Sequence, residues 1–204
     1  IFSQKGCERV MRYAFDLARE RNKLGGSPAG MVTNCTKSNA LNYSMVFWDR
    51  VYNEVARKYP DIKTDMALVD ALTMWMVKNP EYFDVIVASN LFGDIITDLG
   101  AMLQGGMGFA AGGNINPEKE YPSMFEPIHG SAPKYEGKGI VNPIASIESI
   151  RMMLDHLGET DASRDVEAAI SEILAAGIVK TQDMGGNHST SEMGDAVRNV
   201  ILAS

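Results

Sequence analysis

Residues 83–98 read FDVIVASNLFGDIITD, and this stretch passes from a strand-like pattern to a helix-like one without a linker. The first part, Phe83–Ala88, is a short apolar run of the kind that forms a buried strand. The second part, Asn90–Asp98, reads as a helix. Helix-like and strand-like segments alternate on both sides of this stretch, which is the pattern of a mixed α/β protein.

Two carboxylates, those of Asp94 and Asp98, lie one turn apart in the expected helix. Positions i and i+4 share a helix face, so both side chains can point at one position in space. Carboxylate oxygens suit Mg²⁺ or Mn²⁺, and the pair therefore fits a divalent metal site. A plainer interpretation is that the acids only offset the helix macrodipole, because negative charge is favourable near a helix N-terminus.

The segments before residue 83 continue the alternation. They predict helices over 10–18, over 47–59 before Pro60, and over 70–79, with a strand at 31–35 and a short extended piece at Leu68–Val69. The aromatic residues of the second helix, which include Trp48 and Tyr52, have the spacing of buried side chains. We therefore expect them in the core or in a subunit contact rather than around a cofactor.

A glycine-rich stretch, 105–113, changes the character of the chain. Glycine tolerates irregular backbone angles, so we interpret the stretch as a connector between a domain at 1–104 and a domain at 105–204. Three helices are expected in the second domain. One starts at Asn142–Pro143 and runs to Gly158, one covers 162–176 before Gly177, and the last follows a capping box formed by Ser189 and Glu192.

Composition narrows the class of protein. With 204 residues, 45% of them hydrophobic and 22% charged, the chain fits a soluble globular protein. It has no apolar stretch of about 20 residues, and its first residues do not show a basic segment followed by an apolar one. A net charge of −7 argues against nucleic acid as a partner. Two cysteines, Cys7 and Cys35, are expected as reduced thiols and not as nucleophiles. We therefore expect a cytoplasmic protein that binds neither nucleic acid nor a membrane.

Several common catalytic motifs are missing from the sequence. There is no GxGxxG after a strand, no GxxxxGK[ST], no HExxH and no GxSxG. Rossmann dehydrogenases, P-loop NTPases, zinc proteases of the HExxH type and α/β-hydrolases are therefore disfavoured.

A set of short segments is more specific in combination than any one of them. They are TKSNAL at 36–41, LVD at 68–70, Asn90–Asp98, FEPIHGSAP at 125–133 and GKGIVNP at 137–143. Together they resemble the metal-dependent β-decarboxylating dehydrogenases, the isocitrate/isopropylmalate dehydrogenase family, across nearly all of the chain. GFAAGGNINP at 108–117 and YPSM at 121–124 most resemble the tartrate and D-malate members.

This resemblance implies an α/β, isopropylmalate dehydrogenase-like two-domain fold that is incomplete at the N-terminus. The first domain would be most of the small dimerising, metal-binding domain, and the second would be the C-terminal half of the large cofactor-binding domain. The substrate arginines and the catalytic tyrosine of the family lie upstream of the segment that matches Glu8–Arg9. The implied reaction is NAD(P)-dependent oxidative decarboxylation of a 2-hydroxy dicarboxylic acid with Mg²⁺ or Mn²⁺.

The resemblance also assigns catalytic and metal-binding roles. Asp94 and Asp98 would bind the metal from one subunit of a homodimer, while Asp70 and Lys37 would reach the shared site from the partner subunit. Lys37 would be the base that takes the hydroxyl proton, and Asp70 would be both a catalytic residue and a metal ligand. The metal would stabilise the enolate left when CO₂ departs.

Cofactor-binding residues follow in the same way. Asn39 would contact the nicotinamide ribose, and a loop in the second domain would hold the rest of the dinucleotide through Glu126, His129, Gly130, Ala132 and Asn142. Lys134–Tyr135 stands where NAD-using relatives carry an acid, and it resembles the NADP-dependent isocitrate members. Lys180–Asp183, however, lacks the tyrosine and arginine that complete their phosphate site, so both NAD and NADP stay open.

Two alternatives to a tartrate or D-malate dehydrogenase remain. One is 3-isopropylmalate dehydrogenase. The other is a truncated, non-catalytic dimerisation or regulatory subunit. The second is disfavoured because such a subunit has no use for Lys37, Asp70, Asp94 and Asp98 held together.

Overall fold

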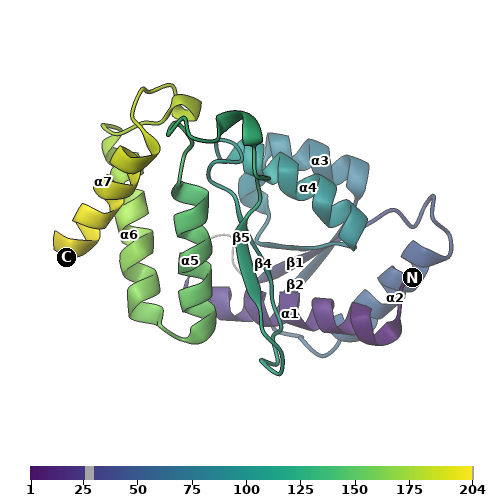
Figure 1. Ribbon diagram of the computed structural model, residues 1–204. Helices are drawn as coiled ribbons and strands as arrows, with labels where there is room; N and C mark the ends of the chain where they lie inside the picture. Colours follow the sequence, from purple (N-terminus) through teal and green to yellow (C-terminus); the bar gives the residue numbers. More distant parts are fainter. Residues whose placement is uncertain (26–29, 204) are drawn as a thin grey trace. The chain divides into compact units, whose positions relative to one another are not determined.

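The computed structural model describes residues 1–25 and 30–203, and its chain forms two compact units, Ile1–Gly100 and Ala101–Ser204 (Figure 1). The division falls inside a helix, α4 (Asn90–Leu103), rather than at the glycine-rich stretch that follows it. Each unit has its own core. We refer to them as unit 1 and unit 2.

Unit 1 is built on a three-stranded parallel sheet with the order β2–β1–β3. Its elements are α1 (Gln4–Lys23), β1 (Met31–Thr36), α2 (Ser44–Ala56), β2 (Lys63–Leu68), α3 (Val69–Lys78), the 3₁₀ turn η1 (Pro80–Tyr82), β3 (Val85–Val87) and α4. The strand at 83–88 and the helix after it are thereby confirmed as β3 and α4, and the sheet confirms the α/β class.

The main core of unit 1 lies between the sheet and helices α1 and α2. Phe15 from α1 is fully buried, with its ring centroid 4.9 Å from that of Tyr59 and 5.6 Å from that of Tyr52. Trp48 from α2 is also buried, and its indole nitrogen donates a 2.6 Å hydrogen bond to Oδ1 of Asn34. The expectation that these aromatic side chains are core residues is confirmed.

Both cysteines are buried in unit 1, and burial raises the pKa of the Cys35 thiol to about 11. At pH 8 only about one Cys35 in a thousand would be the reactive thiolate. We predict that iodoacetamide at pH 8 leaves Cys7 and Cys35 of the folded protein unmodified, as measured by intact mass. The same reagent in 8 M urea, a condition chosen to unfold the chain, should modify both. Rapid labelling of Cys35 without denaturant would contradict this prediction.

Unit 2 combines a two-stranded antiparallel ribbon with three helices. Its elements are β4 (Ala111–Asn114), β5 (Met124–Pro127), the 3₁₀ turn η2 (Pro133–Tyr135), α5 (Ile144–Leu157), α6 (Thr160–Ala176), the 3₁₀ turn η3 (Gln182–Met184) and α7 (Thr190–Ala203). Helices α5, α6 and α7 lie side by side, and their apolar faces form the second core (Figure 1). The three helices expected from the sequence are confirmed.

The helix ends of unit 2 follow the expected signals closely. Ser189 and Glu192 form the capping box, with the Ser189 amide donating to Glu192 Oε2 at 2.7 Å and the Glu192 amide donating to Ser189 Oγ at 3.2 Å. Gly158 ends α5 in the left-handed conformation, as expected. Pro143 is the residue before α5 rather than in its first turn, because the side chain of Asn142 accepts the amide of Ile144 and starts the helix there.

One expectation was wrong in part. The stretch 105–113 is not only a connector, because Gly112 and Gly113 belong to β4 and pair with Glu126 and Phe125. A Cβ atom on Gly112 would lie 2.5 Å from Ile128 Cδ1, and one on Gly113 would lie 3.1 Å from the Phe125 ring. A side chain at either position would therefore require Ile128 or Phe125 to shift. Glycine disfavours strands locally, so no local pattern predicts this pairing.

Within 1–25 and 30–203, no helix is both long enough and apolar enough to cross a bilayer.

Candidate active site

The chain segments that leave the three parallel strands of unit 1 carry the candidate catalytic side chains. Strands β1 and β2 end in register, with Thr36 opposite Leu68, and Val87 at the end of β3 pairs with Asn34. Parallel α/β sheets bind ligands outside the carboxyl ends of their strands. Lys37 follows β1 directly, Asp70 lies in the first turn of α3 after β2, and α4 follows β3.

Lys37 and Asp70 contact each other. The Nζ atom of Lys37 lies 2.6 Å from Oδ1 of Asp70, and the two side chains are 25% and 65% exposed. The hydrogen bond from Lys37 holds the pKa of Asp70 below its usual range. An amine and a carboxylate that the family resemblance assigns to one site are therefore brought together by the fold, and both are partly exposed.

Asn39 lies on the turn that carries Lys37. The amides of Ala40 and Leu41 both donate to the carbonyl of Lys37, at 3.0 and 2.9 Å, and this fixes the turn. Asn39 is exposed at its tip. Asn39 is thus two positions along the chain from Lys37, the proposed base.

Asp94 and Asp98 project from α4 with exposed carboxylates. Ile96 between them is buried against Cys35 and Leu72, and this contact orients the helix on unit 1. In the described part of the chain neither carboxylate has a cationic partner. Two like charges at i and i+4 repel each other by a few tenths of a kcal/mol, a cost that a bound cation would remove.

The carboxylates of Asp70, Asp94 and Asp98 do not form one cluster in the part of the chain that the structure describes. Among residues 1–25 and 30–203, no three His, Cys, Asp or Glu side chains lie close enough to hold a metal ion. Asp70 contacts Lys37, while Asp94 and Asp98 lie one turn apart on α4. That the two pairs meet across subunits remains a prediction.

The predicted cofactor loop lies in unit 2 and begins on the ribbon. Glu126 is exposed on β5 and pairs with Gly112. His129 Nδ1 lies 3.0 Å from the carbonyl oxygen of Gly130. Beyond Gly130 and its two chain neighbours, no atom of the described residues lies within 4 Å of the place where a Cβ of Gly130 would be. The backbone of Gly130 is thus open to the approach of a ligand.

Ala132 has an unusual backbone conformation. Its φ and ψ angles are 42° and 59°, a left-handed conformation that is rare for alanine, and Pro133 follows it directly. A proline restricts the preceding residue to extended conformations, so this geometry carries strain. Strain of this kind collects at ligand-binding and catalytic sites.

Lys134 stacks on its neighbour. Its Nζ atom lies 4.8 Å from the centroid of the Tyr135 ring. Lys138, which the sequence did not single out, places its Nζ atom 5.9 Å from the same ring. Only the four-residue spacing of the two lysines could have suggested this arrangement.

Asn142 has a buried side chain that is already engaged. Its Oδ1 accepts the amide of Ile144, and its Nδ2 donates to Asp183 Oδ2 at 3.0 Å. Thr181 donates its hydroxyl to the other oxygen of Asp183. Any contact of Asn142 with a cofactor in this arrangement would use its backbone. The link to Asp183 spans 41 residues, and no local sequence signal predicts it.

Unit 1 contains a parallel sheet, and unit 2 contains the ribbon and three helices. These units define an α/β protein without a dinucleotide-binding glycine fingerprint. The profile of the family described as isocitrate/isopropylmalate dehydrogenase matches residues 1–197. The chain belongs to this family.

The relatives of this chain are named for different substrates. The chain is 46% identical over 197 residues to a probable tartrate dehydrogenase/decarboxylase of Bacillus subtilis, a match that covers 97% of this chain and 53% of that protein. It is 46% identical over 207 residues to a D-malate dehydrogenase [decarboxylating] of Escherichia coli (99% and 55%). It is 48% identical over 197 residues to a 3-isopropylmalate dehydrogenase of Thermobifida fusca (97% and 53%). The chain thus spans about half the length of these relatives.

A solved structure shows the same fold. The crystal structure of isocitrate dehydrogenase from Methylococcus capsulatus matches 98% of this chain and 57% of its own chain, with a TM-score of 0.91 and 41% identity. The predicted isopropylmalate dehydrogenase-like fold is thereby confirmed.

Proposed function

We propose that the protein carrying this chain is an NAD(P)-dependent oxidative decarboxylase of a 2-hydroxy dicarboxylic acid, of the tartrate or D-malate type. The observation that carries the proposal is the 2.6 Å contact between Lys37 Nζ and Asp70 at the carboxyl ends of the strands. It presents a positioned amine to a ligand at the place where this fold class binds its ligands. The relatives named for tartrate and D-malate support the substrate class.

The residues fit a divalent metal. Asp94 and Asp98 offer hard oxygen ligands on one helix face, are exposed, and have no cationic partner among the described residues. Mg²⁺ or Mn²⁺ bound there would act as a Lewis acid on the substrate oxygens. Lys37, in its neutral amine form, would accept the proton of the substrate 2-hydroxyl at Nζ. Asp70 would hold Nζ in place and, from the partner subunit, add a third carboxylate.

The residues also fit a nicotinamide cofactor, which would accept the hydride of the oxidation. Glu126, His129, Gly130, Ala132 and Asn142 would hold it from unit 2, and Asn39 would contact its nicotinamide ribose. The open backbone at Gly130 and the strained conformation at Ala132 support a ligand-binding loop here.

The proposed functional unit is a homodimer with shared active sites. Unit 1 exposes several large apolar side chains that a second copy would cover, among them Met66, Met74, Trp75, Leu91 and Ile95, which are 48–73% exposed. An isologous interface makes the sharing reciprocal, so each dimer would hold two composite sites. The proposed partners are thus the hydroxy acid and a second copy, in the cytoplasm, with no nucleic acid or membrane.

3-Isopropylmalate dehydrogenase is the second candidate. The relative of that name from Thermobifida fusca is 48% identical to this chain, so overall identity does not separate the substrates. Assays of the full-length protein with tartrate, D-malate and 3-isopropylmalate distinguish the two candidates directly.

The proposed function is tested by its metal dependence. We expect the full-length protein to require Mn²⁺ or Mg²⁺, and Asp94→Asn or Asp98→Asn to raise the Mn²⁺ concentration for half-maximal activity by about tenfold or more, because each change removes an anionic ligand. Asp165→Asn, which changes an exposed helical aspartate of unit 2, is the matched control. Unchanged metal dependence in both variants would remove the metal-site assignment.

Cofactor preference tests the role of Lys134. If this lysine faces a 2′-phosphate, Lys134→Asp should lower the ratio of kcat/KM for NADP over that for NAD by about tenfold or more, because a charge-assisted contact becomes a repulsion. Lys134→Gln should give a smaller change in the same direction. A ratio that stays constant in both variants would show that Lys134 points to solvent.

A further inference from the structure

Asn34, a residue of β1, is buried three positions before Lys37. Its side chain is 0% exposed, and in the sheet it pairs with Val87 at the end of β3. Side chains alternate along a strand, so Asn34 shares a face of β1 with Val32, which belongs to the core between the sheet and helices α1 and α2. A carboxamide buried in an apolar core lowers stability unless its polar atoms are hydrogen-bonded. The carbonyl and the amino group of Asn34 therefore both need partners.

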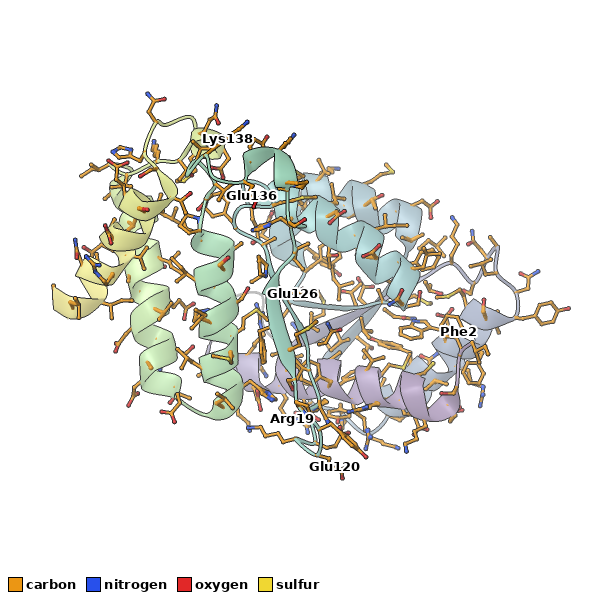
Figure 2. All side chains as sticks on the ribbon, viewed as in Figure 1. Phe2, Arg19, Glu120, Glu126, Glu136 and Lys138 are labelled. Carbon is orange, nitrogen blue, oxygen red and sulfur yellow. The ribbon has the colours of Figure 1, made fainter. Side chains whose placement is uncertain are left out.

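Two consecutive residues of α2 supply these partners. Trp48 donates its indole N–H to Asn34 Oδ1 at 2.6 Å, and Asn34 Nδ2 donates to Asp49 Oδ1 at 2.9 Å. The second hydrogen bond is charge-assisted, because its acceptor is a carboxylate. Phe2, which is labelled in Figure 2, contacts the Trp48 ring at a centroid distance of 6.0 Å and an interplanar angle of 75°. We refer to Asn34, Trp48 and Asp49 as the Asn34 network.

The Asn34 network closes the loop between β1 and α2, on which Lys37 and Asn39 lie. The carbonyl of Leu41 accepts the amide of Met45 at 3.2 Å, so a backbone hydrogen bond joins the turn to the first turn of α2. A shift of α2 relative to the sheet would therefore displace the turn as well. Apolar contacts are non-directional and tolerate small shifts, whereas hydrogen bonds weaken steeply when their geometry changes. The network thus fixes α2, and the turn with it, relative to β1.

We propose that Asn34 and Asp49 are positioning residues, which hold the turn that carries Lys37 and Asn39 in place relative to the sheet. This inference rests on the proposed function, in which Lys37 takes the hydroxyl proton and Asn39 contacts the nicotinamide ribose. Asn34 and Asp49 would act through the turn and not by contact with the substrate or the cofactor. Positioning of this kind matters for the rate, because a misplacement of about 1 Å can cost about a hundredfold.

The kinetic test compares Asp49→Ala with Asp49→Asn in the full-length protein, with NAD or NADP and Mn²⁺. Asp49→Ala removes an acceptor from Asn34. We expect kcat to fall by about tenfold and the KM of the cofactor to rise by about threefold, because the turn carries both Lys37 and Asn39. The Mn²⁺ concentration for half-maximal activity should not change, because the carboxylates proposed to bind the metal lie on α3 and α4. Asp49→Asn keeps an acceptor oxygen and should retain most of the activity.

Hydrogen exchange measures the order of the turn without an activity assay. The amides of Ala40 and Leu41 donate to the carbonyl of Lys37 at 3.0 and 2.9 Å, and in Asp49→Ala they should exchange about threefold faster or more. Glu54→Ala is the matched control, because it removes a carboxylate of the same helix that lies outside this network. It should leave kcat, the cofactor KM and the exchange rates unchanged.

Other results overturn the inference. If Asp49→Ala keeps the kcat, the cofactor KM and the exchange rates of the unchanged protein, Asp49 does not position the turn. A lower kcat without a change in the cofactor KM or in exchange would mean a loss of folded enzyme only. The same pattern in Glu54→Ala would mean a general weakening of α2. If the full-length protein oxidises none of the three hydroxy acids, the proposed function fails, while exchange at Ala40 and Leu41 still decides whether Asp49 holds the turn.

Discussion

Mixing full-length Lys37→Ala protein with full-length Asp94→Ala protein, under conditions in which subunits exchange, should restore about a quarter of the wild-type activity from two inactive parents. The reason is that Lys37 and Asp94 would serve the same site from different chains. Random pairing makes about half of the dimers mixed, and each mixed dimer would hold one intact site. Activity is measured after exchange has been verified with two affinity tags.

The contact between Lys37 and Asp70 supplies a sharp control for this experiment. The side chains of Lys37 and Asp70 meet within one chain at 2.6 Å. The Lys37 and Asp70 of one subunit would therefore belong to the same composite site. A mixture of Lys37→Ala and Asp70→Ala should therefore stay inactive, since neither site of a mixed dimer is intact. Recovery in this mixture, or no recovery in the first one despite exchange, would rule out the proposed sharing.

Replacing Phe15 with alanine should cost about 3–5 kcal/mol of stability, the usual range for a fully buried phenylalanine. Phe15 is 0% exposed and lies against the rings of Tyr52 and Tyr59, so its removal leaves a cavity where α1 packs on α2. Urea unfolding of this chain followed by tryptophan fluorescence measures the change. Both of its tryptophans, Trp48 and Trp75, lie in unit 1 and report on that unit.

Val10→Ala is the matched control for Phe15→Ala, because Val10 lies on the same helix but is 42% exposed. We expect it to change the stability by no more than about 0.5 kcal/mol. A loss for Phe15→Ala as small as that of Val10→Ala would mean that α1 does not pack as described.

Local sequence patterns predicted those helices and strands whose structure is decided by their own residues. The strand at Val85–Val87 and the helix that follows it are confirmed, because an apolar run and a helical spacing are visible within a few residues. The pairing of Gly112 with Glu126 was missed, because it depends on a partner strand that lies elsewhere in the sequence. Tertiary contacts override local propensity in such cases.

Some residues of the candidate site could likewise be predicted from local sequence, and others could not. Asp94 and Asp98 could be recognised from their spacing, and Lys37 with Asp70 only from the family resemblance. The fold then brought Lys37 and Asp70 into contact. The link from Asn142 to Asp183 depends on how loops fold onto each other, and spacing alone does not encode that. The metal and cofactor roles remain predictions.

The junction between β2 and α3 restricts how this protein can evolve. Strand β2 ends at Leu68 and helix α3 begins at Val69, so no linker separates the sheet from the carboxylate of Asp70. One inserted residue would turn Asp70 by about 100° around the helix axis and away from Lys37. Families commonly reshape their sites by changing loop lengths. At this junction a change in length would separate Lys37 from Asp70, so the contact between them can persist only where the junction keeps its length.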